Sequence, residues 1–350
     1  MQLKPANVLD SCYKVMTNRR FIAEWEPQKG VLIAWPHTDT DWTSTLPAVN
    51  KCYRHVAQAI TEDEHLIIAA PDADMVREQL NGLDNTRYSI VEVPTNDTWA
   101  RDFGPLTVEV DGTPTLLDFT FNAWGMKFAA DKDNLITSRL IWHGALPLPA
   151  ENQRDMVLEG GSVETDGRGT LLTTSECLLS PNRNSHWSRA EIERQLKLRL
   201  GVTKVLWLDH GSLPGDDTDS HIDTLARLAP GNTIVHITAQ PNNEEYREVQ
   251  RMIEQLQTFT NADGIPFRLV PLPAPSPILD ADGHRLPATY ANYLVTNHRV
   301  LVPTYGQPDN DRRAIETLAH VFRGRKVLGI DCRPLIEQHG SLHCITMQLH

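Results

Sequence analysis

The sequence predicts an α/β fold made of repeated units, each consisting of a β-hairpin, a helix and one further strand. Short apolar runs of strand length alternate along the chain with helical patterns. Several of these runs form pairs across a turn, as residues 106–110 and 115–119 do across Asp111-Gly112. The paired runs begin near residues 106, 157, 222 and 292, which indicates a recurring unit.

The predicted helices carry apolar residues on one face and have recognisable ends. The clearest begins at the capping box Ser188-Arg-Ala-Glu191, continues through Ile192 and Leu196, and stops at Gly201. We expect further helices over residues 49–60, 246–256 and 315–322, and shorter ones near 75–80 and 135–140.

The predicted strands are β-branched or apolar runs that stop at Pro, Gly, Asp or Asn. Single strands are expected at residues 31–35, 66–69, 204–208 and 267–271. Paired strands are expected at 156–164 with 170–174, at 222–228 with 233–238, and at 293–295 with 300–303.

A fifth unit is complete if the last strand, expected at residues 343–348, pairs with residues 31–35. The five units would then close into a ring, which leaves no unpaired sheet edges and brings distant segments together at its centre. The alternative is a mixed α/β domain without such closure.

Composition and charge exclude several classes of protein. The chain has 33 Lys+Arg and 45 Asp+Glu, a net charge of −12, which argues against a nucleic-acid partner. No run of apolar residues is long enough to span a membrane, and residues 1–10 do not resemble a signal peptide, so we expect a cytoplasmic protein. The five cysteines are widely spaced and predict neither a disulfide framework nor a zinc cluster.

Residues 215–223 form the segment richest in side chains that can act in catalysis or bind a metal. It holds four carboxylates and a histidine, and in an extended strand His221 and Asp223 would point to the same face. One alternative is a solvated acidic loop. Another is a divalent-metal site formed by Asp216, Asp217, Asp219, His221 and Asp223, although no specific ligand spacing is present.

Three further residues stand out because of where they lie in the repeat. Cys344 follows a turn of small residues at the start of the last predicted strand, whereas we expect Cys12, Cys52, Cys177 and Cys332 to be structural. Asp102 and Glu159 each stand at the opening of a predicted hairpin. In a closed ring, these residues would meet His221 and Asp223 near one axis.

Several stretches in this order resemble the agmatine deiminase family, one of the guanidine-modifying enzymes that include peptidylarginine and arginine deiminases. The matching stretches are Glu24-Trp-Glu-Pro27, Ala34-Trp-Pro-His37, Trp99-Ala-Arg-Asp-Phe-Gly-Pro105, Phe121-Asn-Ala-Trp-Gly125, Leu158-Glu-Gly-Gly161, Asp217-Thr-Asp-Ser-His-Ile-Asp223, Asn292-Tyr-Leu294, Val302-Pro-Thr-Tyr-Gly306 and His343-Cys-Ile-Thr346. The resemblance implies a five-bladed α/β propeller and one deiminase domain over residues 1–350.

The resemblance also implies a reaction, in which the guanidinium of agmatine is hydrolysed to N-carbamoylputrescine and ammonia through a covalent thiouronium intermediate. It assigns the nucleophile to Cys344 and the guanidinium clamp to Asp102 and Asp223. His221 would be the general acid and base, oriented by Glu159. Trp99 would form a flat wall of the substrate pocket.

The same resemblance implies no cofactor and no metal, and a small cationic guanidino compound as the binding partner, with no nucleic acid and no membrane. A homo-oligomer remains open. Alternatives to agmatine are arginine or peptidyl-arginine, and alternatives to a deiminase are a metal-dependent hydrolase or a non-catalytic binder of cations. The run His339-Gly-Ser-Leu342 departs from the glycine-rich run with Asn and Ile that such enzymes usually carry before the His-Cys pair.

Two carboxylates beside Cys344 would disfavour its thiolate. We therefore expect the free enzyme to hold mostly the thiol, and we expect the bound cation to promote ionisation. A preformed thiolate paired with protonated His221 is the alternative.

Overall fold

The computed structural model describes residues 18–350, so Cys12 lies outside the described residues. Within residues 18–350, the strands form five separate sheets of three or four strands each. Each sheet repeats one connection: an antiparallel hairpin is followed by a helix and then by a strand parallel to the second strand of the hairpin. The recurring unit predicted from the sequence is therefore confirmed.

The first two units follow one another in the chain. The first contains β5 (Leu106–Val110), β6 (Thr113–Thr120), α5 (Ile136–Trp142) and β7 (Ala150–Val157), with β1 (Arg19–Phe21) added at the edge of β5. The second contains β8 (Val163–Thr165), β9 (Thr170–Thr174), α7 (Arg189–Leu200) and β10 (Lys204–Leu208). Short helices in these units are α4 (Ala123–Met126), η1 (Asp133–Leu135), η2 (Gly160–Ser162) and α6 (Ser175–Leu178).

The next two units have the same order of elements. The third contains β11 (Ala226–Ala229), β12 (Thr233–His236), α9 (Tyr246–Leu256) and β13 (Arg268–Pro271). The fourth contains β14 (Leu294–Val295), β15 (Arg299–Thr304), α10 (Pro308–Val321) and β16 (Lys326–Asp331). Short helical turns flank them: α8 (Ile222–Leu225) precedes β11, and α11 (Arg333–Ile336) follows β16.

The fifth unit joins segments from opposite ends of the described chain. Strand β17 (Met347–Leu349) runs antiparallel to β2 (Gly30–Ala34), with Met347 opposite Leu32. Helix α1 (Leu46–Thr61) then leads to β3 (His65–Ala70), and α2 (Ala73–Gln79) leads to β4 (Tyr88–Glu92). The predicted pairing of the last strand with residues 31–35 is confirmed, although the strand begins at Met347 rather than at His343.

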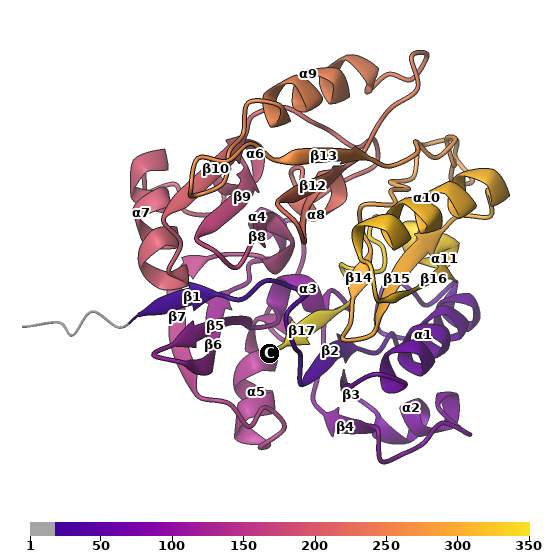
Figure 1. Cartoon of the computed structure of the whole chain (residues 1–350). Helices are drawn as coiled ribbons and strands as arrows, with labels where there is room; N and C mark the ends of the chain where they lie inside the picture. The colour runs from indigo at the N-terminus through magenta and orange to yellow at the C-terminus, as the bar shows by residue number, and fades with distance from the viewer. Residues whose placement is uncertain (1–17) are drawn as a thin grey trace, which may run out of the picture.

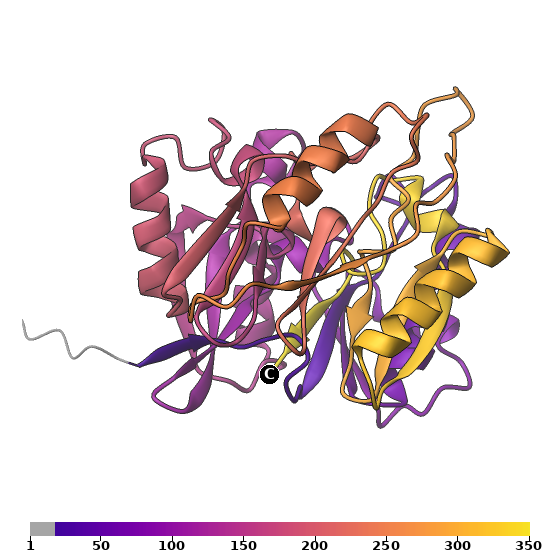
Figure 2. The ribbon, with the colours of Figure 1, turned by 45° about the horizontal axis from the view of Figure 1, so that its top comes forward.

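The long helices form as their sequence patterns predict. The Ser188 side chain caps α7 by accepting a hydrogen bond from the Glu191 backbone N–H, and Gly201 ends the helix in the left-handed conformation with φ of 71°. In α1, Val49 and Tyr53 lie on the buried face. Figure 1 shows α1, α7, α9 and α10 at the periphery, while α3 (Ala100–Phe103) and α8 lie near the centre. The tilted view in Figure 2 shows the same helices on the outside.

Two predicted strands are partly helical instead. Residues 158–162 do not continue a strand, because η2 separates β7 from β8. The backbone at Gly160 also packs closely on Arg101: a Cβ at position 160 would lie 2.2 Å from the backbone oxygen of Arg101. Residues 222–225 form α8, so alternation along a strand is not what brings His221 and Asp223 together. Across residues 18–350 we find no helix that combines the length and the apolar composition needed to span a bilayer.

Candidate active site

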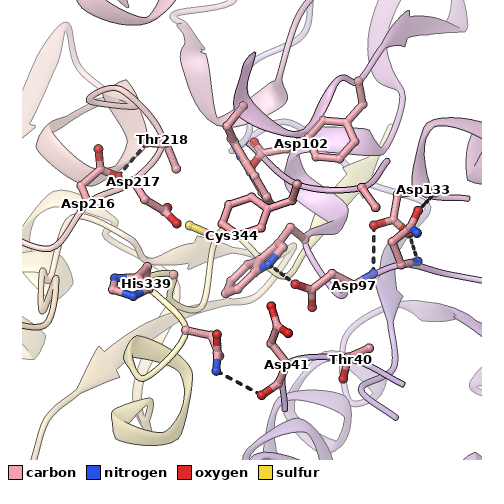
Figure 3. Close-up of a pocket in the computed structure, with 18 of the residues that line it drawn as sticks. Thr40, Asp41, Asp97, Asp102, Asp133, Asp216, Asp217, Thr218, His339 and Cys344 are labelled. Atoms are coloured by element: carbon pink, nitrogen blue, oxygen red, sulfur yellow. Dashed lines mark hydrogen bonds between the residues drawn. The ribbon is translucent and has the colours of Figure 1, made fainter. Parts of the chain in front are cut away.

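A cavity of about 500 Å³ opens near the centre of the molecule, and Cys344 lies in its wall. Figure 3 shows the Cys344 sulfur between Asp216 and Asp217 on one side and Asp97 and Asp133 on the other. Among the described residues, the lining includes no lysine and no arginine. Its acidic side chains are Asp39, Asp41, Asp97, Asp102, Asp133, Asp216 and Asp217.

The Cys344 thiol is held by the side-chain amide of Asn292. Its Sγ atom lies 3.2 Å from Nδ2 of Asn292, and the Asn292 Oδ1 atom accepts the backbone N–H of His343 at 2.8 Å. The thiol is buried and lies near Asp223 and Asp102. Burial first, and then these two carboxylates, raise the pKa of Cys344 well above its ordinary value. The free site therefore favours the thiol, in the direction expected from the sequence.

Asp102 lies on the single helical turn α3 and points into the cavity. Its Oδ1 atom accepts the backbone N–H of Gly161 at 3.0 Å, and its Oδ2 atom accepts the indole N–H of Trp124 at 3.0 Å. Burial raises the pKa of Asp102 to about 6, although the neighbouring His221 charge opposes that shift. A cationic ligand would stabilise the ionised form.

Asp223 lies on the turn α8 and has one oxygen free. Its Oδ2 atom lies 2.7 Å from Nδ1 of His343 and 3.3 Å from Nδ2 of Asn292, whereas Oδ1 is buried with no hydrogen-bond partner in the described part of the chain. Burial alone would raise the pKa of Asp223, but the hydrogen bond and charge of His343 outweigh it and lower the pKa. An ionised carboxylate with a free oxygen is suited to accept an N–H of a guanidinium.

His221 lies between two carboxylates. Its Nδ1 atom is 3.6 Å from Oδ1 of Asp102, and its Nε2 atom is 3.7 Å from Oε2 of Glu159. Burial would lower the pKa of His221, but Asp102 and other neighbours outweigh burial and raise it well above the ordinary value. A Cβ at Gly161 would lie 2.6 Å from Nδ1 of His221, so glycine is needed for this close approach.

Glu159 is fixed from behind by a buried arginine. The Nε atom of Arg183 donates to the two oxygens of Glu159 at 2.8 and 3.0 Å, and its Nη1 atom reaches Asp219 at 2.6 Å. Burial would raise the pKa of Glu159, but the nearby imidazole of His221 and the charge of Arg183 lower it. Arg183 is thus occupied by carboxylates and does not line the cavity.

Trp99 forms part of the cavity wall. The indole N–H donates to Asp97 at 2.9 Å, and the ring lies against the turn before Cys344. A Cβ at Gly340 would lie 2.0 Å from Cζ3 of Trp99, so only glycine fits at this position. The altered run at residues 339–342 therefore keeps a backbone that packs directly on the wall of the pocket.

The structure brings Asp102, Glu159, His221, Asp223 and Cys344 into one region, as the ring hypothesis required. It does not assemble the alternative metal cluster, because Asp219 pairs with Lys127 and Arg183 instead.

The sequence reasoning missed the roles of four residues: Trp124, Arg183, Asn292 and His343. Three of them lie in the matched stretches, whereas Arg183 carried no signal.

Comparison with known proteins shows the family to which this chain belongs. A sequence profile of the Porphyromonas-type peptidyl-arginine deiminases matches residues 20–349. A protein of Vibrio parahaemolyticus named "Putative agmatine deiminase" is 33% identical, over 94% of this chain and 96% of its own. A crystal structure of a "Putative Arginine Deiminase" from Porphyromonas gingivalis has 49% identity and a TM-score of 0.90, and covers 94% of this chain and 98% of its own.

A structure of a cysteine-to-serine variant of the C. jejuni agmatine deiminase with bound substrate has 35% identity and a TM-score of 0.89, covering 95% of this chain and 96% of its own. Fold and relatives define a hydrolase that acts on the C–N bonds of amidine groups. The chain belongs to the Porphyromonas-type peptidyl-arginine deiminase family. The resemblance to guanidine-modifying enzymes stated from the sequence is confirmed.

Proposed function

We propose that the protein hydrolyses agmatine to N-carbamoylputrescine and ammonia. The observation that carries this proposal is the composition of the cavity wall, which contains seven aspartates and, among the described residues, neither lysine nor arginine. Agmatine has a guanidinium at one end and an ammonium at the other, so both ends would meet carboxylates. The net charge of −12 would also attract such a dication, although salt screens this effect.

Free arginine fits the same cavity less well. Its carboxylate would need a basic partner, because leaving a charge unpaired in a buried site is costly. Neither Arg183 nor Arg313 supplies such a partner: Arg183 binds Glu159 and Asp219, and Arg313 lies exposed on α10.

In the proposed reaction, Asp102 and Asp223 hold the guanidinium, and the thiol of Cys344 loses its proton to solvent as the cation binds. The thiolate attacks the guanidinium carbon, and protonated His221 gives a proton to the departing nitrogen, which leaves as ammonia. Water then attacks the thiouronium carbon while neutral His221 takes its proton. The C–S bond breaks, the urea product forms and the thiolate of Cys344 is restored.

Ammonia release from agmatine, arginine and benzoyl-arginine amide, measured side by side, tests the substrate. We expect the highest kcat/KM for agmatine, and Cys344→Ser should reduce turnover to background because a hydroxyl is a far weaker nucleophile. Cys332→Ser is the matched control, since Cys332 is buried outside the cavity lining. If kcat/KM for either arginine compound equals that for agmatine, the assignment of agmatine as substrate is wrong. The assignment to the class of guanidine deiminases would still hold.

Arginine and peptidyl-arginine are the competing substrates because relatives carry those names. For either of them, the distal carboxylate or peptide would have to leave the cavity toward solvent, where no basic partner is required. Peptidyl-arginine would then be favoured over free arginine, because it has no free carboxylate next to the acidic wall. Benzoyl-arginine amide is therefore a more informative competitor of agmatine than free arginine.

We further propose that the five units close into a five-bladed α/β propeller and that residues 1–350 act as one deiminase domain. The pairing of β17 with β2 supports closure, since it joins the two ends of the described chain in one sheet. The cavity lining supports the single domain, because it combines segments that lie far apart in the chain, within residues 39–41, 96–133, 216–224 and 338–344.

A further inference from the structure

Glu159, Cys177 and His221 are three side chains of different chemistry that converge in the buried interior. We propose that Glu159, Cys177 and His221 form a binding site for a thiophilic divalent cation such as Zn²⁺, and that its occupation inhibits the enzyme. All three residues are buried, and their ligand atoms lie within 4.8 Å of one another. The inhibition rests on the proposed function of His221, whereas the binding does not.

The distances suit a tetrahedral ion. The Oε2 atom of Glu159 lies 3.7 Å from Sγ of Cys177 and 3.7 Å from Nε2 of His221. With metal–sulfur bonds of about 2.3 Å and metal–nitrogen or metal–oxygen bonds of about 2.0 to 2.1 Å, the edges of a tetrahedral site measure roughly 3.3 to 3.6 Å. The two edges at the Glu159 oxygen are therefore within a few tenths of an ångström of a tetrahedral site, and the edge between Cys177 and His221 is at most 4.8 Å.

The ligand atoms are also available. The Nε2 atom of His221 is buried and has no hydrogen-bond partner within residues 18–350, because 3.7 Å to Glu159 exceeds hydrogen-bond length. An unpartnered buried nitrogen is costly, and a metal ion would satisfy it. Cys177 forms no disulfide with any other described cysteine, so its sulfur can bind a metal.

The surroundings provide the outer contacts that metal ligands usually have. The opposite ring nitrogen of His221 lies 3.6 Å from the carboxylate of Asp102, just beyond hydrogen-bond length, and a carboxylate on that side of the ring is a usual partner of metal-binding histidines. Arg183 holds the Glu159 carboxylate at 2.8 Å. A dication that replaces the Cys177 thiol proton and the Nε2 proton of His221 leaves the net charge unchanged, so Arg183 can stay in place.

Occupation would change what His221 can do. The Nδ1 side of the ring faces Asp102 and the reaction centre, whereas Nε2 faces the proposed metal. A metal on Nε2 prevents the imidazolium form, so His221 could not readily deliver a proton to the leaving ammonia. Inhibition should be reversed by a chelator, because no bond to Cys344 is needed.

Cobalt titration of the Cys344→Ser protein tests the binding without turnover and without the competing nucleophilic thiol. We expect one equivalent of Co²⁺ to give thiolate charge-transfer and tetrahedral visible bands that Zn²⁺ displaces and Mg²⁺ does not. In Cys344→Ser/Cys177→Ser the charge-transfer band should disappear and the Kd should rise at least tenfold. The matched control, Cys344→Ser/Cys332→Ser, should keep both.

A second variant guards against a folding defect. Cys344→Ser/His221→Ala, shown by circular dichroism to be folded, should also bind Co²⁺ at least tenfold more weakly. No cobalt–thiolate band in Cys344→Ser, or an unchanged band after loss of Cys177 or His221, would overturn the proposal. Neither result depends on which guanidino compound the enzyme hydrolyses, so a wrong substrate assignment would leave this test intact.

Discussion

The Nδ1 atom of His343 lies 2.7 Å from Oδ2 of Asp223, while Nε2 of the same ring lies 2.6 Å from Oε1 of Glu24. Glu24 is in turn bound by Arg101, at 3.1 Å, and by Arg227. The ring therefore connects a buried charge network to Asp223, the carboxylate that we propose binds the guanidinium. In the proposed reaction His343 is a positioning residue, since it would act on the substrate only through Asp223.

Replacing His343 should impair the clamp without removing it. In His343→Leu, Asp223 loses a charge-assisted hydrogen bond, on the order of 1.5 to 3 kcal/mol, so kcat/KM for agmatine should fall roughly ten- to a hundredfold. His343→Asn, whose amide can donate from nearly the position of Nδ1, should recover part of the loss. A merely structural role predicts equal kcat/KM and unequal melting temperatures for the two variants.

Asp102→Asn and Asp223→Asn should each lower kcat/KM roughly ten- to a hundredfold, because each removes a charged acceptor of guanidinium N–H groups. Asp41→Asn is a control on the wall of the same cavity, where we expect a smaller effect. If both clamp variants keep wild-type kcat/KM, the guanidinium is held elsewhere.

The acid limb of the pH profile of kcat/KM should come from the ionisation of Asp102. Burial raises the pKa of Asp102 to about 6 in the free protein. Ionised Asp102 binds the cation, so kcat/KM should rise as pH increases through about 6 and then level off. Asp102→Asn should remove this limb. A limb that persists in Asp102→Asn would have to be assigned to another group.

His221→Ala should separate chemistry from binding. It removes proton transfer in both half-reactions, so turnover should fall roughly 10²- to 10⁴-fold while agmatine binding changes little. Calorimetric titration of Cys344→Ser with and without His221→Ala measures the binding. If the double variant binds agmatine more weakly, His221 contributes to substrate binding and not only to proton transfer.

Cys344 should titrate at high pH in the free protein, because burial, Asp223 and Asp102 raise the pKa of its thiol. Ultraviolet thiolate absorbance, with Cys344→Ser subtracted, should therefore show little ionisation at neutral pH and should increase only at a pH well above that of an ordinary cysteine titration. A non-reacting guanidinium compound should shift this titration to lower pH. A thiolate already present at neutral pH without ligand would support the preformed ion pair.

The order of units could be predicted from the sequence because each hairpin and helix has a local signal. The turn Asp111-Gly112 and the capping box at Ser188 are clear in the chain and form as expected. The helical turns that carry Asp102 and Asp223 could not be predicted, because four residues are too few to show a period. The side chains of Asp102 and Asp223 are therefore positioned by helical turns and not by the strands that we expected.

The missed residues act through contacts between distant segments. Asn292 touches Cys344, and Arg183 touches Glu159, only after the units have packed together. No local pattern distinguishes such an amide or guanidinium from a surface residue. Through the family resemblance, the sequence did indicate the set of groups proposed to react with a guanidinium: a thiol, an imidazole and carboxylates.

The pairing of β17 with β2 has a consequence for folding. It closes a very long loop, so its formation carries a large entropy cost and should come late. Cys344 lies just before β17 and takes its position from that strand and from Asn292. During refolding, catalytic competence should therefore return after helix content does, so the onset of turnover would report the last non-local step rather than the first collapse.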